Sequence, residues 1–102
     1  MLVTTRDYAI GWLVLELGLR PQEIVGLDVG DVDLEAEICT VRWRGRERRL
    51  RFRGRVGDGL EAYSDERPDG PGAFFVSRKD GGRLTTRRVR QIMSKIYSSL
   101  NN

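Results

Sequence analysis

The sequence predicts an α+β domain in which helices pack on a small three-stranded antiparallel sheet. Apolar residues recur at helical spacing near both ends of the chain, over residues 4–17 and 84–100. Between these segments, residues 37–43 and 47–52 alternate apolar and polar side chains, which is typical of paired strands. A length of 102 residues with 32% charged side chains fits one domain, which we assign to residues 1–102.

The first predicted helix covers residues 4–17. Thr4 and Asp7 have the spacing of a capping box, and Gly18 is a natural residue to end the helix. The helix carries a wide apolar stripe, and we expect this stripe in the core together with its two aromatic residues, Tyr8 and Trp12.

A second, short helix is predicted for residues 21–26, with Pro21 at its first position and Arg20 at its N-cap. Residues 27–37 are rich in Asp and Gly, and we expect them to form a solvated, acidic turn. The arginine-rich hairpin comes next, and a tight turn at residues 44–46 joins its two strands.

The second half of the chain is predicted to contain two more helices. Residues 56–67 have helical character that is weakened by two glycines, Gly57 and Gly59. Residues 73–77 form a short apolar run that predicts a strand. The last helix, over residues 84–100, has Thr85 as its N-cap and a clear apolar face.

Charge is unevenly distributed along the chain. Residues 1–41 carry two basic and eight acidic side chains, whereas residues 42–55 carry eight arginines and one glutamate. Residues 78–95 add seven basic side chains and one acidic one. Close positive charges repel one another unless counter-ions or phosphates neutralise them, so the clusters indicate an anionic partner. The plainer alternative is that these residues form a solvated charged face.

Several kinds of site are excluded by the residue types that are missing. With no histidine and one cysteine, Cys39, we expect no zinc site, no Ser-His-Asp triad, and no metal or cofactor. No glycine-rich loop is followed by the Lys-Ser/Thr pair that binds phosphate. The longest apolar block, residues 8–19, is interrupted by Glu16 and fits a buried helix better than a membrane span. The lone cysteine and the absence of a signal peptide favour a cytoplasmic protein.

Three motifs stand in a distinctive order: GLRPQEIVGL at residues 18–27, DVDLEAE at residues 31–37 before the arginine-rich hairpin, and AFFVSRKDGGRLTTRRVRQIM at residues 73–93. In this order the chain resembles the first half of the catalytic domain of the tyrosine recombinase (phage integrase) family, from about Thr5 to Leu100. The resemblance implies the catalytic-core fold of DNA breaking–rejoining enzymes. It also implies that the parent activity is site-specific breakage and rejoining of double-stranded DNA through a 3′-phosphotyrosyl intermediate.

The resemblance implies roles for single residues. Arg20 matches the first of two arginines that grip the scissile phosphate, and Glu23 matches the acidic residue that supports this arginine. The family's lysine acid falls at Arg44, whose guanidinium can bind phosphate but does not readily release a proton near neutral pH. Contacts to DNA are expected from the hairpin, the basic loop and the start of the last helix, through Arg42, Arg44, Arg46, Arg48, Arg78, Lys79, Arg83, Arg87 and Arg88.

The resemblance ends before the family's His-x-x-Arg motif and its tyrosine nucleophile. We therefore expect a DNA-binding fragment of a recombinase that does not cut DNA by itself. Two other hypotheses stay open: a non-catalytic DNA-binding remnant or regulator, and an interaction module that forms homo-oligomers through an exposed apolar face. Replacing Arg20 by alanine is expected to weaken duplex binding more than replacing Arg6.

Overall fold

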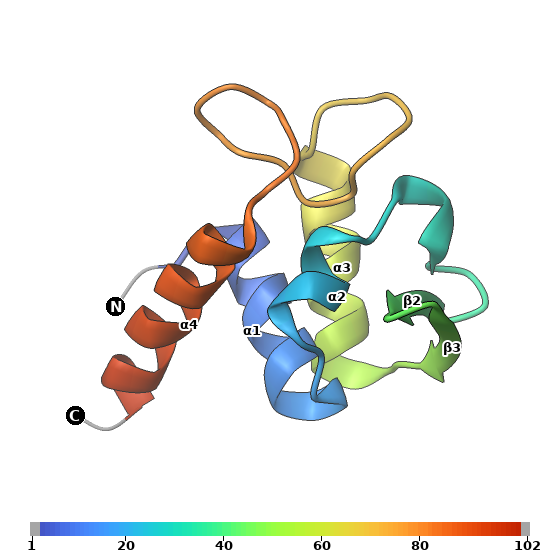
Figure 1. The fold of residues 1–102 in the computed structure, drawn as a ribbon, viewed down its shortest axis with the longest axis horizontal. Coiled ribbons are helices and arrows are strands. Elements are labelled where there is room, and N and C mark those ends of the chain that lie inside the picture. Colours follow the sequence, from blue (N-terminus) through green and yellow to red (C-terminus); the bar gives the residue numbers. More distant parts are fainter. Residues whose placement is uncertain (1–2, 101–102) are drawn as a thin grey trace.

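The computed structural model describes residues 3–100, so the two ends of the predicted domain, 1–2 and 101–102, lie outside the described residues. The elements, in chain order, are α1 (Thr5–Leu17), α2 (Pro21–Val25), the 3-10 turn η1 (Val29–Asp31), β1 (Val32–Asp33), β2 (Ile38–Trp43), β3 (Arg46–Arg51), α3 (Gly54–Glu66) and α4 (Thr86–Leu100). Helix α4 lies at one end of the molecule and the sheet at the other, with the remaining helices between them (Figure 1). The predicted α+β class with a three-stranded antiparallel sheet is confirmed.

The caps at three helix ends are those that the sequence indicates. Thr4 Oγ1 accepts a hydrogen bond from the Asp7 N–H at 3.1 Å, and Gly18 ends α1 with a φ of 66°. Thr85 Oγ1 accepts a hydrogen bond from the Arg88 N–H at 3.1 Å at the start of α4. These contacts satisfy backbone groups that a helix end otherwise leaves unpaired.

A glycine allows α1 and α3 to approach closely. A Cβ on Gly59 would lie 3.2 Å from the Cα of Ala9 and 3.2 Å from Cδ1 of Tyr8, which is tighter than ordinary contact. The glycine that weakens the helical prediction for this segment is therefore needed for packing. Helix α3 begins at Gly54, two residues before its predicted start.

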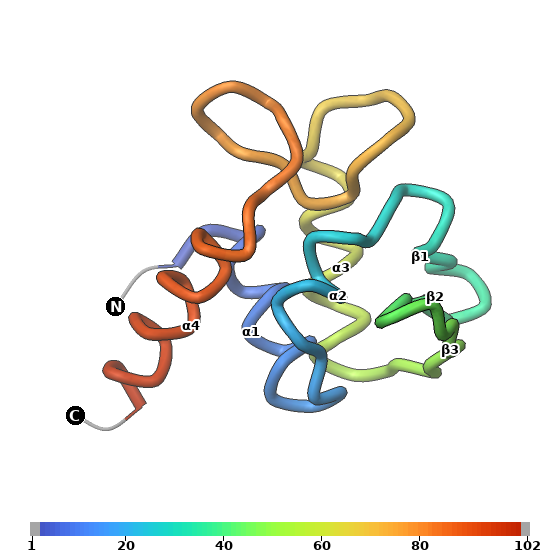
Figure 2. The backbone as a smooth tube through the Cα atoms, viewed as in Figure 1, coloured from blue at the N-terminus to red at the C-terminus, as the bar shows by residue number. Residues whose placement is uncertain are grey.

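The sheet is an antiparallel meander in the order β1-β2-β3, at the end of the molecule opposite α4 (Figure 2). Arg44 and Gly45 join β2 to β3, with φ values of 51° and 76°. Two successive left-handed residues make the two-residue turn whose twist suits a hairpin. Arg44, unlike Gly45, adopts this conformation at an energetic cost because it carries a Cβ.

The predicted strand at residues 73–77 is not part of the sheet. Ala73 and Val76 form only isolated bridges, to Asp28 and Arg83, and the third strand is instead the two-residue β1. Phe74 and Phe75 are both buried, whereas successive side chains of a strand point to opposite faces. The apolar run reflects a core-filling loop, which alternation alone does not distinguish from a short buried strand.

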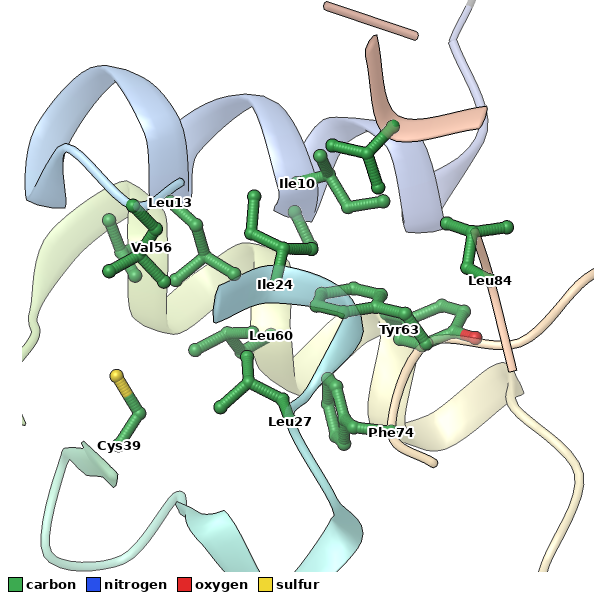
Figure 3. Close-up of a cluster of buried hydrophobic side chains, with 14 of the residues drawn as sticks. Ile10, Leu13, Ile24, Leu27, Cys39, Val56, Leu60, Tyr63, Phe74 and Leu84 are labelled. Atoms are coloured by element: carbon green, nitrogen blue, oxygen red, sulfur yellow. The ribbon is translucent and has the colours of Figure 1, made fainter. Parts of the chain in front are cut away.

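The core is formed between the three central helices and this loop (Figure 3), with side chains that include Ile10, Leu13, Ile24, Leu27, Leu60, Tyr63 and Phe74. The Tyr63 ring stacks on Phe75 at 5.2 Å, and its hydroxyl accepts a hydrogen bond from the Val76 N–H at 3.1 Å. The predicted core placement of Tyr8 is wrong, since Tyr8 is 39% exposed, and Trp12 is only partly buried. The apolar stripe of α1 is wider than the surface that α3 and α4 cover.

Candidate nucleic-acid interface

A buried carboxylate connects α2 to the hairpin. The side chain of Glu23 in α2 has no exposed area. Its Oε1 accepts hydrogen bonds from the Arg20 backbone N–H at 3.0 Å and from Arg20 Nη1 at 3.4 Å. Its Oε2 accepts one from Arg48 Nη2 of β3 at 2.8 Å. The predicted support of Arg20 by Glu23 thus has a geometric basis, and it includes an arginine from the hairpin.

These contacts keep Glu23 ionised. Burial by itself raises the pKa of the Glu23 carboxyl, because it removes water from the charged form. The hydrogen bonds from the Arg20 N–H and from Arg48, together with the charges of both arginines, outweigh burial and hold the pKa below its usual value. At neutral pH the carboxylate is therefore a fixed negative anchor for two guanidinium groups.

Trp43, the last residue of β2, forms cation–π contacts with both Arg20 and Arg44. The guanidinium carbon of each arginine lies 4.9 Å from the centroid of the Trp43 ring. Half of the Arg20 side chain remains exposed, and Arg44 is exposed at the tip of the hairpin. We call Arg20, Glu23, Trp43, Arg44 and Arg48 the hairpin cluster.

The roles of two members of the hairpin cluster differ from what the sequence indicates. Arg48 was predicted to contact DNA, and the structure shows it bonded to Glu23, 25 residues away along the chain. For Trp43, the sequence predicts only a place on one face of a strand. The alternation of β2 and β3, which places both residues on the inward-facing side with Val41 and Leu50, is the signal that could have identified them.

A second buried carboxylate holds another hairpin arginine. Arg42 Nη1 lies 2.8 Å from Asp31 Oδ2, and Arg42 Nε lies 3.2 Å from Glu47 Oε1. The prediction that the whole acidic turn is solvated is wrong for Asp31, which is 9% exposed. Burial raises the pKa of Asp31, but hydrogen bonds from Arg42 and from the Asp28 N–H leave this pKa below its usual value.

Arg83 bonds to the backbone at and just beyond the end of α2. Its Nη1 donates hydrogen bonds to the carbonyl oxygens of Val25, at 2.6 Å, and Leu27, at 3.3 Å. Its Nη2 forms an ion pair with Asp28. Three predicted DNA-binding arginines, Arg42, Arg48 and Arg83, therefore have internal partners that hold the fold together.

The remaining basic side chains that were predicted to contact DNA form no ion pair with the described residues. Arg46 is exposed at the start of β3. The other four, which we call the α4 basic cluster, line an open hollow of about 460 Å³ at the start of α4: Arg78, Lys79, Arg87 and Arg88. The start of α4 lies away from β2 and β3 (Figure 1), so the structure divides the predicted basic residues between two regions.

Within residues 3–100, no helix is long and apolar enough to cross a membrane. The same part of the chain contains no group of three His, Cys, Asp or Glu side chains arranged to hold a metal ion.

Comparison with known proteins identifies the family. A model described as the phage integrase family matches residues 3–102. Tyrosine recombinase XerC of Corynebacterium efficiens is 35% identical over 94 residues, covering 88% of this chain and 30% of the relative. Tyrosine recombinase XerD of Mycobacterium tuberculosis is 34% identical over 99 residues, covering 89% and 32%.

The fold agrees with these matches. The crystal structure of XerA recombinase has a TM-score of 0.79 to this chain and 29% sequence identity, covering 89% of this chain and 34% of that one. The chain therefore spans about a third of the length of the relatives that it matches. Since the family model matches nearly every residue, this chain belongs to the phage integrase family.

Proposed function

We propose that this chain is a DNA-gripping part of a site-specific tyrosine recombinase, in which Arg20 and Arg44 hold the phosphate of the strand to be cut. The observation that carries the proposal is the convergence of two accessible guanidiniums on one tryptophan ring, with one of them anchored by a buried carboxylate. The names of the relatives, which are recombinases, support the same function.

The chemistry of phosphoryl transfer explains what this geometry can do. Negative charge on the phosphate oxygens grows toward the transition state, and preoriented donors stabilise it without reorganising. Guanidinium groups present several N–H donors in a planar fork that matches phosphate oxygens. Arg20 and Arg44 therefore suit electrostatic stabilisation, while Arg44 is a poor proton donor for the leaving oxygen.

No tyrosine in the described part of the chain belongs to the hairpin cluster. Tyr63 is buried and its hydroxyl is bonded to the Val76 N–H. Tyr8 packs against Trp12 on α1, and Tyr97 lies on α4. We propose that the 102-residue chain binds duplex DNA without forming a covalent adduct, because the nucleophile and the second arginine motif of the family are not matched by these residues.

Duplex binding tests the proposal. Fluorescence anisotropy with a labelled duplex should show binding at low salt that weakens steeply as salt rises. The logarithm of the binding constant should fall linearly with the logarithm of the salt concentration, with a slope of about 0.9 for each phosphate contacted. Arg20→Ala should weaken binding about tenfold at low salt, because it removes a charged, preoriented contact. No binding at low salt by the unaltered chain would refute the proposal.

Arg55 supplies the matched control for Arg20. Its guanidinium carbon lies 5.0 Å from the Trp12 ring, so it is another arginine stacked on a tryptophan, outside the hairpin cluster. Arg55→Ala should weaken binding no more than about twofold, through the loss of general positive charge. Arg6, the control that the sequence suggested, is unsuitable because it is buried and paired with Asp7. Equal losses for Arg20→Ala and Arg55→Ala would remove the site assignment.

A second candidate function is self-association. An apolar hollow of about 240 Å³ lies between α1 and α4, lined by residues that include Tyr8, Leu15, Ile96 and Leu100. Leu15 is 44% exposed and Leu100 is 63% exposed, which is unusual for a fully covered domain. Sedimentation velocity across a concentration series should show oligomers that Leu15→Ser reduces. An oligomer unaffected by Leu15→Ser, or a monomer at all concentrations, would contradict this use of the hollow.

A further inference from the structure

We propose that Trp43 is a positioning residue that holds Arg20 and Arg44 ready for a single phosphate, an inference that rests on the proposed function above. One ring serves both arginines, since each guanidinium carbon lies 4.9 Å from its centroid. The two guanidinium carbons are consequently no further apart than twice this distance. Trp43 therefore orders two cations from different elements, the N-cap of α2 and the hairpin turn, beside one ring.

Besides the ring, the Arg20 guanidinium has one ion-pair partner among the described residues, Glu23. Arg20 Nη1 lies 3.4 Å from Glu23 Oε1, at the long end of the hydrogen-bond range, and this oxygen also accepts the Arg20 backbone N–H. Glu23 Oε2 is taken by Arg48. Within residues 3–100, the Arg44 guanidinium forms no ion pair or hydrogen bond, so the ring is its contact there.

Stacking on Trp43 lowers the conformational entropy that the two arginines lose when they bind a phosphate. A mobile arginine must lose rotamer freedom when it grips a ligand, and a side chain already ordered on a ring has lost part of it. Two guanidiniums held close together also repel each other. The electron-rich face of an indole attracts cations more strongly than a phenyl ring does, so Trp43 offsets part of this repulsion.

The same chemistry elsewhere in the chain provides a control. Arg55 stacks over Trp12 at 5.0 Å, but this pair involves a single arginine and no buried carboxylate. Replacing Trp12 removes a cation–π contact of the same kind. The comparison therefore separates the effect of stacking in the hairpin cluster from any general effect of losing a tryptophan.

Affinity for duplex DNA is the first test, measured by anisotropy at low salt with the full chain. Trp43→Leu should weaken binding about three- to tenfold, which is the range expected for a partly desolvated cation–π contact. Trp43→Phe keeps an aromatic face and should stay within about twofold of the unaltered chain, as should Trp12→Leu. Equal losses for Trp43→Leu and Trp12→Leu would overturn the proposal.

A mutant cycle distinguishes a Trp43 ring that positions the two arginines from one that contacts DNA directly. In a chain that already carries Arg20→Ala and Arg44→Ala, Trp43→Leu should weaken binding by less than about twofold, because the groups through which it acts are gone. The same loss in both backgrounds would mean that the ring touches DNA itself, as by stacking on a base, and would overturn the positioning role.

The arginine side-chain N–H signals of the free protein give a readout that does not depend on DNA. In nitrogen-15 spectra, Trp43→Leu should move two arginine Nε–H signals away from ring-shifted positions, and Arg20→Ala and Arg44→Ala should identify them. Absence of ring-shifted signals in the free chain would overturn the stacking. Absence of duplex binding by the unaltered chain would instead overturn the proposed function, so the two failures can be distinguished.

Discussion

The hairpin cluster and the α4 basic cluster are both rich in positive charge, but their surroundings differ. In the hairpin cluster, Arg20 and Arg48 bond to the buried carboxylate of Glu23. In the α4 basic cluster, the guanidinium of Arg88 contacts Gln91 at 3.4 Å, and the described residues offer no ion pair to any of the four basic side chains. The hairpin cluster is built around a buried carboxylate, and the α4 basic cluster has no such anchor among the described residues.

This difference separates two uses of arginine. Fixed guanidiniums can stabilise charge at one atom, because their donors need not reorganise. Solvated guanidiniums add long-range attraction and phosphate contacts, which position a duplex without selecting one phosphodiester. On this comparison, substitutions in the hairpin cluster should change stability and affinity together, whereas those in the α4 basic cluster should change affinity alone.

The largest effect is expected from Glu23→Gln, which breaks the hairpin cluster at its anchor. The amide leaves two guanidiniums without their counter-charge, and unfolding should become easier by about 2 kcal/mol, since the carboxylate is buried but its partners are half exposed. Urea denaturation measures this change, and duplex affinity should fall with it. Glu16→Gln, on the exposed side of α1, should change stability by less than about 0.5 kcal/mol. Equal effects of the two substitutions would show that Glu23 is not an anchor.

Arg48 and Arg46 sharpen the comparison within a single strand. Arg48→Ala removes an ion pair to Glu23 and should cost about 1 kcal/mol of stability. Arg46→Ala removes an exposed arginine and should leave stability within about 0.5 kcal/mol while weakening duplex binding. Thermal unfolding and anisotropy on both variants test this split. If Arg46→Ala were the more destabilising, the division between fixed and free arginines would be wrong.

A smaller loss of stability is expected in acid. Since the pKa of Glu23 is lowered in the folded chain from an ordinary value of 4.5, its stabilising contribution is present above that value and is lost as pH falls through the folded pKa. Asp31, lowered from 3.8, contributes in the same direction. Urea denaturation from pH 6 downward should therefore show declining stability below about pH 4.5, and Glu23→Gln should flatten this decline. An unchanged slope in the variant would contradict the assignment.

The smallest effect on stability is expected in the α4 basic cluster. Arg87→Ala combined with Arg88→Ala should leave the free energy of unfolding within about 0.5 kcal/mol, because neither side chain forms an ion pair within residues 3–100. The slope of the logarithm of the binding constant against the logarithm of the salt concentration should fall in magnitude by about 2, because two arginines that neutralise phosphates are removed. Anisotropy at several salt concentrations measures the slope. An unchanged slope would mean that this cluster does not contact the duplex.

The local features of the fold could be predicted from the sequence because they depend on neighbours in the chain. The Thr4 and Thr85 caps, the Gly18 end of α1 and the tight hairpin turn, predicted for residues 44–46 and found at Arg44 and Gly45, all involve residues within a few positions of one another. The proximity of Arg20 and Glu23 is also local, since three residues separate them across the first turn of α2. Capping and turn formation act over this range.

The distant contacts could not be predicted in this way. The strand predicted at residues 73–77 is instead a core loop, because Phe74 and Phe75 both find apolar partners in the core. The two-residue strand β1 is too short to leave a pattern in the sequence. Asp31 was expected in solvent, yet it is buried against Arg42, 11 residues away.

The sequence by itself determined the family resemblance, the helices with their caps, the arginine-rich hairpin and the local Arg20–Glu23 pair. Only the tertiary structure decided which arginines are anchored and which are free, because this depends on how the hairpin packs on α2. That packing places Arg48 on the buried carboxylate, and it brings to the Trp43 ring two guanidinium groups that lie 24 residues apart along the chain. The sequence gives the position of each charged residue in the chain, but its burial and its partners depend on how distant segments pack together.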